Sequence, residues 1–221
     1  MKNKLNIYKM KYLFKFNESD FSSKDLGFVD DINIDKSMHS NIPSNANDFL
    51  KSVKFIKKKF DINQFVDLGC GSGDTINWTS DYFKNNYGIE FSNKYVEYAK
   101  TLLDKNKISN YNIIKGDILK EVSYGAIPKV PSFVYSYLPF EGRSDYNKSG
   151  ISKQSENMNK MFDVCYNYFP KGSIFYFPYW SYPIKSDVLL DNKKVDIINF
   201  RYKSDVLDSV QFECMYYKRD K

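Results

Sequence analysis

Hydrophobic positions follow a helical period directly after residue 43. Phe49, Val53, Ile56 and Phe60 recur three or four residues apart, with lysines between them. The spacing predicts an amphipathic helix. The intervening lysines are Lys51, Lys54, Lys57, Lys58 and Lys59. They could contact phosphate, but a run of charge on a helix is usually solvated, so we expect them on its outer face.

Short apolar runs typical of strands recur through the rest of the chain. They cover residues 64–68, 86–91, 111–119, 132–140, 172–180, 195–203 and 209–218. Helical patterns follow the first, second and fourth of these runs, at about 75–84, after a predicted N-cap at Ser92, and at 158–168. This order predicts an α/β fold: a doubly wound, mostly parallel seven-stranded sheet with helices on both faces, a three-layer αβα sandwich. The last two runs lack a helix between them and predict an antiparallel C-terminal edge hairpin.

The length of 221 residues is enough for one sizeable core and short for two independent domains. We therefore expect one domain over residues 44–221. Residues 1–43 show no regular period and form an N-terminal extension. The extension is either a lid or substrate-facing segment, or a partly ordered tail packed on the domain.

Composition narrows the class of protein. Hydrophobic residues make up 42% of the chain, which indicates a globular protein. The net charge of +6 is not gathered into a basic stripe, so a dedicated nucleic-acid binder is disfavoured. Cys70, Cys165 and Cys214 are widely separated, which argues against disulfides and structural zinc and favours a reducing cytoplasm. We expect no signal peptide and no membrane span.

The stretch Asp67–Gly73 places glycine at every second position directly after a predicted strand. Main chain without Cβ atoms can turn sharply and approach a ligand closely. A dinucleotide fingerprint would need a third glycine at position 74, which is Asp74. Carboxylates here disfavour a pyrophosphate, and hence a nicotinamide dehydrogenase, and favour a cationic adenosyl ligand.

The residues VDLGCGSG at 66–73 resemble the first motif of class I S-adenosylmethionine-dependent methyltransferases. The resemblance implies S-adenosylmethionine as cofactor. It also implies that Glu90 accepts from both ribose hydroxyls, that Asp117 accepts from the adenine amino group, and that Ile118 lies against the ring. The candidate cofactor-binding residues are Asp67, Gly69, Cys70, Gly71, Gly73, Glu90, Phe91, Asp117, Ile118 and Ser136.

The fourth predicted strand ends in residues that, in the resembling family, face the transferred methyl group. The stretch departs from the Asp or Asn, Pro, Pro, aromatic pattern of many base methylases, because only Pro139-Phe140 remains, displaced by one residue. A general base is needed only when the nucleophile carries a proton. The candidate catalytic residues are Tyr135, Tyr137, Glu141 and His39. Metal assistance would need clustered carboxylates just after this strand, where only Glu141 and Asp145 are available, so we expect no metal.

We expect a methyltransferase acting on an oxygen or nitrogen nucleophile. A small-molecule acceptor is favoured over a protein lysine, and a nucleic acid is less favoured still. The alternative is a non-catalytic scaffold that keeps the cofactor fold. An aromatic stretch after the fifth strand either lines an acceptor pocket or packs in the core. It comprises Phe177, Pro178, Tyr179, Trp180 and Tyr182. The sequence does not indicate an oligomeric state.

Overall fold

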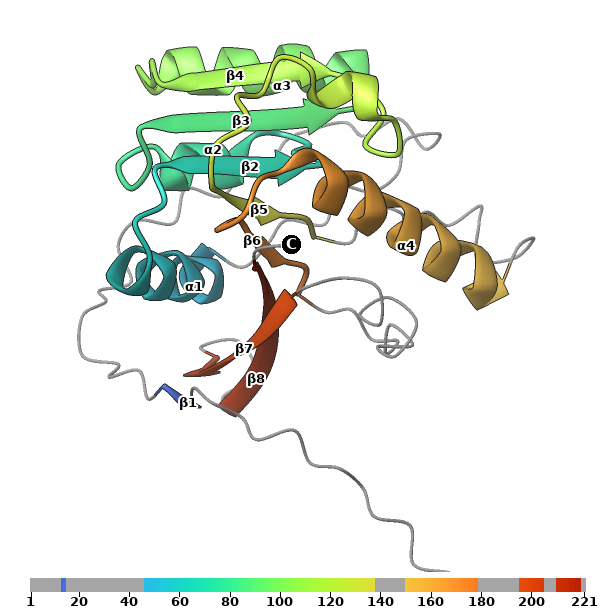
Figure 1. The fold of residues 1–221 in the computed structure, drawn as a ribbon. Helices are drawn as coiled ribbons and strands as arrows, with labels where there is room; N and C mark the ends of the chain where they lie inside the picture. Colours follow the sequence, from blue (N-terminus) through green and yellow to red (C-terminus); the bar gives the residue numbers. More distant parts are fainter. Residues whose placement is uncertain (1–12, 15–45, 138–149, 179–194, 205–209, 220–221) are drawn as a thin grey trace, which may run out of the picture.

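The computed structural model describes residues 13–14, 46–137, 150–178, 195–204 and 210–219. They form one sheet with helices on both faces (Figure 1). The strands are β1 (Leu13–Phe14), β2 (Gln64–Leu68), β3 (Asn85–Glu90), β4 (Tyr111–Lys115), β5 (Ser132–Tyr135), β6 (Ile174–Tyr176), β7 (Val195–Lys203) and β8 (Val210–Lys218). The helices are α1 (Ala46–Lys59), α2 (Asp74–Thr79), α3 (Asn93–Lys105), α4 (Gly150–Tyr168) and the 3₁₀ helix η1 (Glu121–Tyr124).

The strand order is β1-β7-β8-β6-β5-β2-β3-β4. Strands β2 to β6 pair in parallel, and β8 pairs antiparallel with both β6 and β7. The predicted doubly wound sheet with its antiparallel C-terminal hairpin is confirmed. The two-residue strand β1 was not predicted, and it pairs in parallel with β7 beyond the hairpin. The rest of the 1–43 extension lies outside the described residues.

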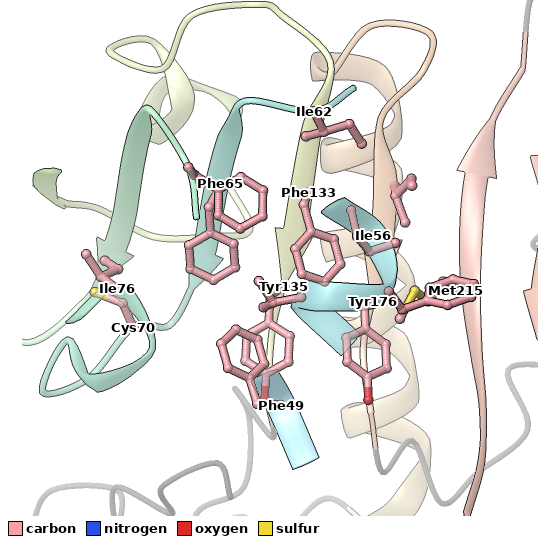
Figure 2. Close-up of a cluster of buried hydrophobic side chains, with 14 of the residues drawn as sticks. Phe49, Ile56, Ile62, Phe65, Cys70, Ile76, Phe133, Tyr135, Tyr176 and Met215 are labelled. Atoms are coloured by element: carbon pink, nitrogen blue, oxygen red, sulfur yellow. The ribbon is translucent and has the colours of Figure 1, made fainter. Parts of the chain in front are cut away.

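Two buried clusters fill the space between the sheet and its helices. Successive strand residues alternate between them, as the pleat requires: Phe65 packs with α1, α2 and α3, whereas Val66 packs with α4 and η1. Phe133 and Val134 repeat this division one strand away. Figure 2 shows the first cluster, in which Phe65 and Phe133 extend from neighbouring strands toward α1. Every central strand is therefore covered on both faces.

Some predicted boundaries were wrong. Helix α2 ends at Thr79 and not near residue 84. The main-chain N–H groups of Tyr82 and Phe83 both donate to the Thr79 carbonyl, which forms a tight turn. The turn lets Phe83 stack on Phe65 with ring centroids 5.6 Å apart. Burial of an aromatic side chain thus outweighs continuation of the helix. Helix α4 begins at Gly150, earlier than the predicted residue 158.

The expectation of a solvated lysine face on α1 holds for Lys58 and Lys59 but is wrong for Lys51. Lys51 is buried, donates to the Lys203 carbonyl at the end of β7, and lies 3.4 Å from the Asp48 carboxylate. Asp48 also accepts from the Ser204 hydroxyl at 2.6 Å. A buried cation needs such partners, because desolvation without them is costly. This cluster joins α1 to the end of β7.

A second buried lysine joins β8 to helix α4. The Lys218 ammonium donates to the main-chain carbonyls of Tyr166 and Phe169, the latter at 2.7 Å. These carbonyls lie in and just after the last turn of α4, where the helix dipole favours a positive charge. Lys218 therefore satisfies acceptors that the helix itself leaves without donors.

In the described part of the chain, no helix has both the length and the apolar character that crossing a membrane requires.

We expect Lys218→Met to lower the free energy of unfolding by about 1–3 kcal/mol, because two buried carbonyls lose a charged donor. Urea unfolding followed by circular dichroism measures the change. Lys160→Met is the matched control, since Lys160 is an exposed lysine of α4, the helix that Lys218 caps. Equal stability of the two variants would contradict a capping role for Lys218.

Candidate functional site

The glycine loop between β2 and α2 has a left-handed main chain at alternate positions. The φ angles are 81° at Gly69, 51° at Gly71 and 84° at Gly73. Residues with a Cβ rarely adopt such angles. At Gly73 a Cβ would also lie 3.0 Å from the Ala99 Cβ of α3. The spacing of glycines seen in the sequence is therefore required by the path of the loop.

The loop is hydrogen-bonded to the end of β3. The N–H groups of Gly69 and Cys70 donate to the Ile89 carbonyl, at 2.8 and 3.2 Å. The Gly71 N–H donates to one carboxylate oxygen of Glu90 at 3.0 Å, and the Ser92 N–H donates to the other at 2.7 Å. The Glu90 side chain is thereby fixed beside the loop.

Asp67, the last polar residue of β2, is buried beneath the loop. Its carboxylate accepts from the Thr75 hydroxyl, on the first turn of α2. Burial is the main reason that the pKa of Asp67 is raised to about 7; the Thr75 hydrogen bond opposes the shift, and the charges of Glu90 and Asp74 add to it. The site therefore holds three acids close enough to repel one another.

Cys70 turns its side chain away from the loop surface and into the core. Figure 2 shows it beside Ile76, and a Cβ at Gly88 would lie only 2.6 Å from its sulfur. Burial raises the pKa of the Cys70 thiol well above its ordinary value, with Asp67 and Glu90 adding to the effect. Only the main chain of Cys70 can contribute to a ligand site on the loop.

Phe91 follows Glu90 and is 72% exposed, an unusual state for a large aromatic side chain in a chain with an extensive core. The Lys115 ammonium, at the end of β4, lies 4.6 Å from the centre of its ring. The next strand end carries Asp117 and the buried Ile118. The carboxyl ends of β2, β3 and β4, which are neighbours in the sheet, thus bring together the loop, Glu90 and the Asp117 turn.

The end of β5 differs from the expectation. Tyr135 was predicted to be catalytic, but its side chain is 2% exposed and its ring packs 4.5 Å from that of Phe49. Ser136 was predicted to bind cofactor, but its hydroxyl is buried and donates to the Leu68 carbonyl at 2.6 Å. Period-two alternation turns Tyr135 into the α1 side of the core. Both side chains hold β5 in place rather than facing the loop surface.

Tyr137, another candidate catalytic residue, is partly buried. Its side chain packs against the core cluster on the α1 side of the sheet. His39 and Glu141 lie outside the described residues, as do Tyr179, Trp180 and Tyr182 of the aromatic stretch. Phe177 is buried in the core cluster beside α4. In the part of the chain that the structure describes, no three His, Cys, Asp or Glu side chains are arranged to hold a metal ion.

Three residues that support the site were not singled out from the sequence: Thr75, Ser123 and Tyr124. Thr75 could have been found, because it lies in the first turn of the helix that follows the glycine loop and can reach back to the acid at the end of the preceding strand. Ser123 and Tyr124 belong to η1, which is four residues long. So short a helix leaves no periodic pattern in the sequence.

Comparison with known proteins agrees with this arrangement. Residues 59–126 match a family model described as a methyltransferase domain. No curated protein sequence gives a match.

Similar folds occur in solved structures. An rRNA methylase from Streptococcus thermophilus has a TM-score of 0.52 and 14% identity, over 76% of this chain and 95% of that one. A candidate methyltransferase from Streptococcus mutans, in complex with SAH, has a TM-score of 0.51 and 14% identity, over 80% and 99%. The methyltransferase domain of bacterial CtHen1-CN has a TM-score of 0.54 and 11% identity, over 78% and 100%. At these identities the similarity shows the fold.

We expect Asp67→Asn to stabilise the protein at pH 8. The folded-state pKa of about 7 exceeds the ordinary value of 3.8, so the unfolded chain releases this proton first. The free energy of unfolding of the wild-type protein should therefore fall between about pH 4 and 7. Above pH 7 the ionised Asp67 should lower it by a constant amount of up to about 4 kcal/mol. Unfolding by denaturant between pH 5 and 8 tests this. Asp81→Asn, at an exposed position, is the control. If the stability of Asp67→Asn depended on pH in the same way as that of the wild-type protein, the raised pKa of Asp67 would be contradicted.

Proposed function

We propose that this chain is a class I, S-adenosylmethionine-dependent methyltransferase that transfers the methyl group to an oxygen or nitrogen nucleophile of a small molecule. One observation carries the assignment of the site: the glycine loop, Glu90 and the Asp117 turn meet at the carboxyl ends of three adjacent parallel strands. Open α/β sheets bind ligands in the crevice at this edge.

The described residues fit S-adenosylmethionine. The loop offers bare main chain at Gly69, Gly71 and Gly73, against which the methionine part can lie. Glu90 has further lone pairs for the ribose hydroxyls, because each of its oxygens accepts one main-chain N–H. Phe91 and the Asp117 turn flank the place expected for adenine. We infer that these groups hold the cofactor.

The charges of the site favour a cation over a pyrophosphate. Asp67, Asp74 and Glu90 lie around the loop, and no lysine or arginine has a described ion pair with any of them. A sulfonium and an ammonium are attracted to such carboxylates, whereas phosphates are repelled. Above pH 7 Asp67 is ionised, which strengthens this preference. This supports the adenosyl cofactor over a nicotinamide dinucleotide.

When bound, the cofactor supplies an electrophilic methyl group. The reaction is a displacement at carbon, so the protein contributes mainly alignment and exclusion of water. Tyr137, Glu141 and His39 remain our proposed sources of a hydrogen bond or a base for an acceptor that carries a proton. Tyr135 and Ser136 are not proposed again, because both are engaged inside the domain.

A protein lysine is our second proposed acceptor, and a nucleic acid the least favoured. The end of β5 lacks the residue pattern of base methylases. The same strand end supports one different function, that of a scaffold that binds the cofactor without catalysis. Ser136 and Tyr135 both direct their side chains into the domain, so the described residues of this strand end, up to Tyr137, offer the acceptor few polar groups.

We expect Gly71→Arg to abolish binding of S-adenosylhomocysteine, because a side chain at φ 51° distorts the loop and covers its surface. Glu90→Ala should weaken binding by about tenfold or more, because a charged acceptor is lost. Isothermal titration calorimetry measures both.

Gly172→Arg is the matched control for Gly71→Arg, because Gly172 also has a left-handed φ, of 84°, but lies before β6, at the other end of the strands. The exposed Glu97→Ala controls for Glu90→Ala. Unchanged affinity in both site variants would refute the site.

Turnover separates the enzyme from the scaffold. The protein is incubated with methyl-labelled S-adenosylmethionine and separate pools of metabolites, proteins and nucleic acids. We expect label in the metabolite pool, and none with Gly71→Arg. Label confined to proteins or nucleic acids would replace the proposed acceptor class. Cofactor binding without labelling of any pool would favour the scaffold.

A further inference from the structure

The turn after β4 is closed by its own main chain. The Lys120 N–H donates to the Asp117 carbonyl at 2.9 Å, and the Leu119 N–H donates to Oδ1 of the Asp117 carboxylate at 3.0 Å. The second oxygen, Oδ2, lies 3.5 Å from the Lys120 ammonium, whose side chain is 67% exposed. One carboxylate oxygen thus stabilises the turn, and the other lies on its solvent side.

Ser123 of η1 holds the first peptide group of this turn. The Asp117 N–H donates to the Ser123 hydroxyl at 2.9 Å. The two segments approach this closely because Gly116 has no side chain: a Cβ there would lie 2.7 Å from both Cβ and Oγ of Ser123. The orientation of the Gly116–Asp117 peptide is therefore set by η1.

Tyr124 holds the next part of the turn. Its ring is fully buried, and its hydroxyl donates to the Ile118 carbonyl at 2.8 Å. The same oxygen lies 3.5 Å from the Cys165 sulfur of α4, and the ring packs 5.3 Å from that of Tyr168. The position of Ile118 is thereby coupled to α4, the longest of the described helices.

These bonds leave two groups of the turn able to bind a ligand, because the ion pair of Oδ2 with the exposed Lys120 ammonium leaves that oxygen further lone pairs. Oδ2 of Asp117 is an acceptor, and the Ile118 N–H is a donor for which the described residues supply no acceptor. An acceptor beside a donor is the complement of the amino group and ring nitrogen on the edge of adenine. The pair discriminates between purines only if its spacing is fixed.

We propose that η1 is the positioning element of the adenine subsite, with Ser123 and Tyr124 fixing Asp117 and Ile118 so that the site selects a purine bearing a 6-amino group. The proposal rests on the cofactor-binding function proposed above. Ser123 and Tyr124 do not contact the ligand. Their loss therefore lowers selectivity for the amino group rather than all binding equally.

The test compares two ligands in calorimetry: S-adenosylhomocysteine and its analogue with purine riboside in place of adenosine, which lacks only the 6-amino group. The wild-type protein should bind the first about tenfold more tightly, as expected for one hydrogen bond to a charged acceptor. Ser123→Ala and Tyr124→Phe should each reduce this ratio to about twofold, mostly through weaker binding of S-adenosylhomocysteine.

Two variants control for general loosening. Tyr168→Phe removes a buried hydroxyl from the adjacent ring, but that hydroxyl donates to Ile127 beyond η1, so the ratio should remain that of wild type. Ser80→Ala removes a hydroxyl that donates to Asn77 in α2 and should also leave the ratio unchanged. If Tyr124→Phe fails to fold, the half-buried Ser123→Ala decides the outcome.

A wild-type ratio in folded Ser123→Ala and Tyr124→Phe overturns the positioning role while leaving the cofactor site intact. Equal losses for both ligands, with the ratio unchanged, also overturn it, because they indicate a structural role alone. Absence of binding of either ligand by the wild-type protein overturns the proposed function as well.

Discussion

The arrangement of the carboxyl edge depends on the contact between the glycine loop and the end of β3. Two consecutive N–H groups, of Gly69 and Cys70, share the Ile89 carbonyl, and the next one donates to Glu90. The contact is possible because Gly88 leaves room for the Cys70 side chain beneath the loop. The loop and the acid are thus a single hydrogen-bonded unit, and the position of either sets that of the other.

Local signals in the sequence were sufficient to predict most of the sheet and the left-handed glycine loop after β2. Alternate glycines need left-handed φ angles, and apolar runs of period two or 3.6 specify which face is buried. They gave less information about boundaries. Helix α2 ends early because Phe83 gains a core position, and Lys51 is buried because the end of β7 supplies its partners. Such contacts join segments far apart in the chain.

The same distinction applies to the site residues. The positions of Gly71 and Glu90 follow from a motif and a strand end, which are local features. The period of β5 indicates that Tyr135 and Val134 face opposite ways, but not that Phe49 of α1 covers the tyrosine. The role of η1 depends on hydrogen bonds between residues that no repeating pattern connects. Prediction from sequence therefore placed the loop and Glu90 at neighbouring strand ends, as the structure has them, and missed the residues of η1 that hold the Asp117 turn.

The placement of β8 has a consequence for the order in which the domain is made. This strand is translated after β7 yet lies between β7 and β6. On the ribosome, β6 therefore remains an open sheet edge, with unpaired N–H and C=O groups, until β8 has emerged. The parallel half of the sheet must tolerate this interval without pairing with another nascent chain. Closure by a late, distant segment also favours slow folding, because much chain entropy is lost before the contacts form.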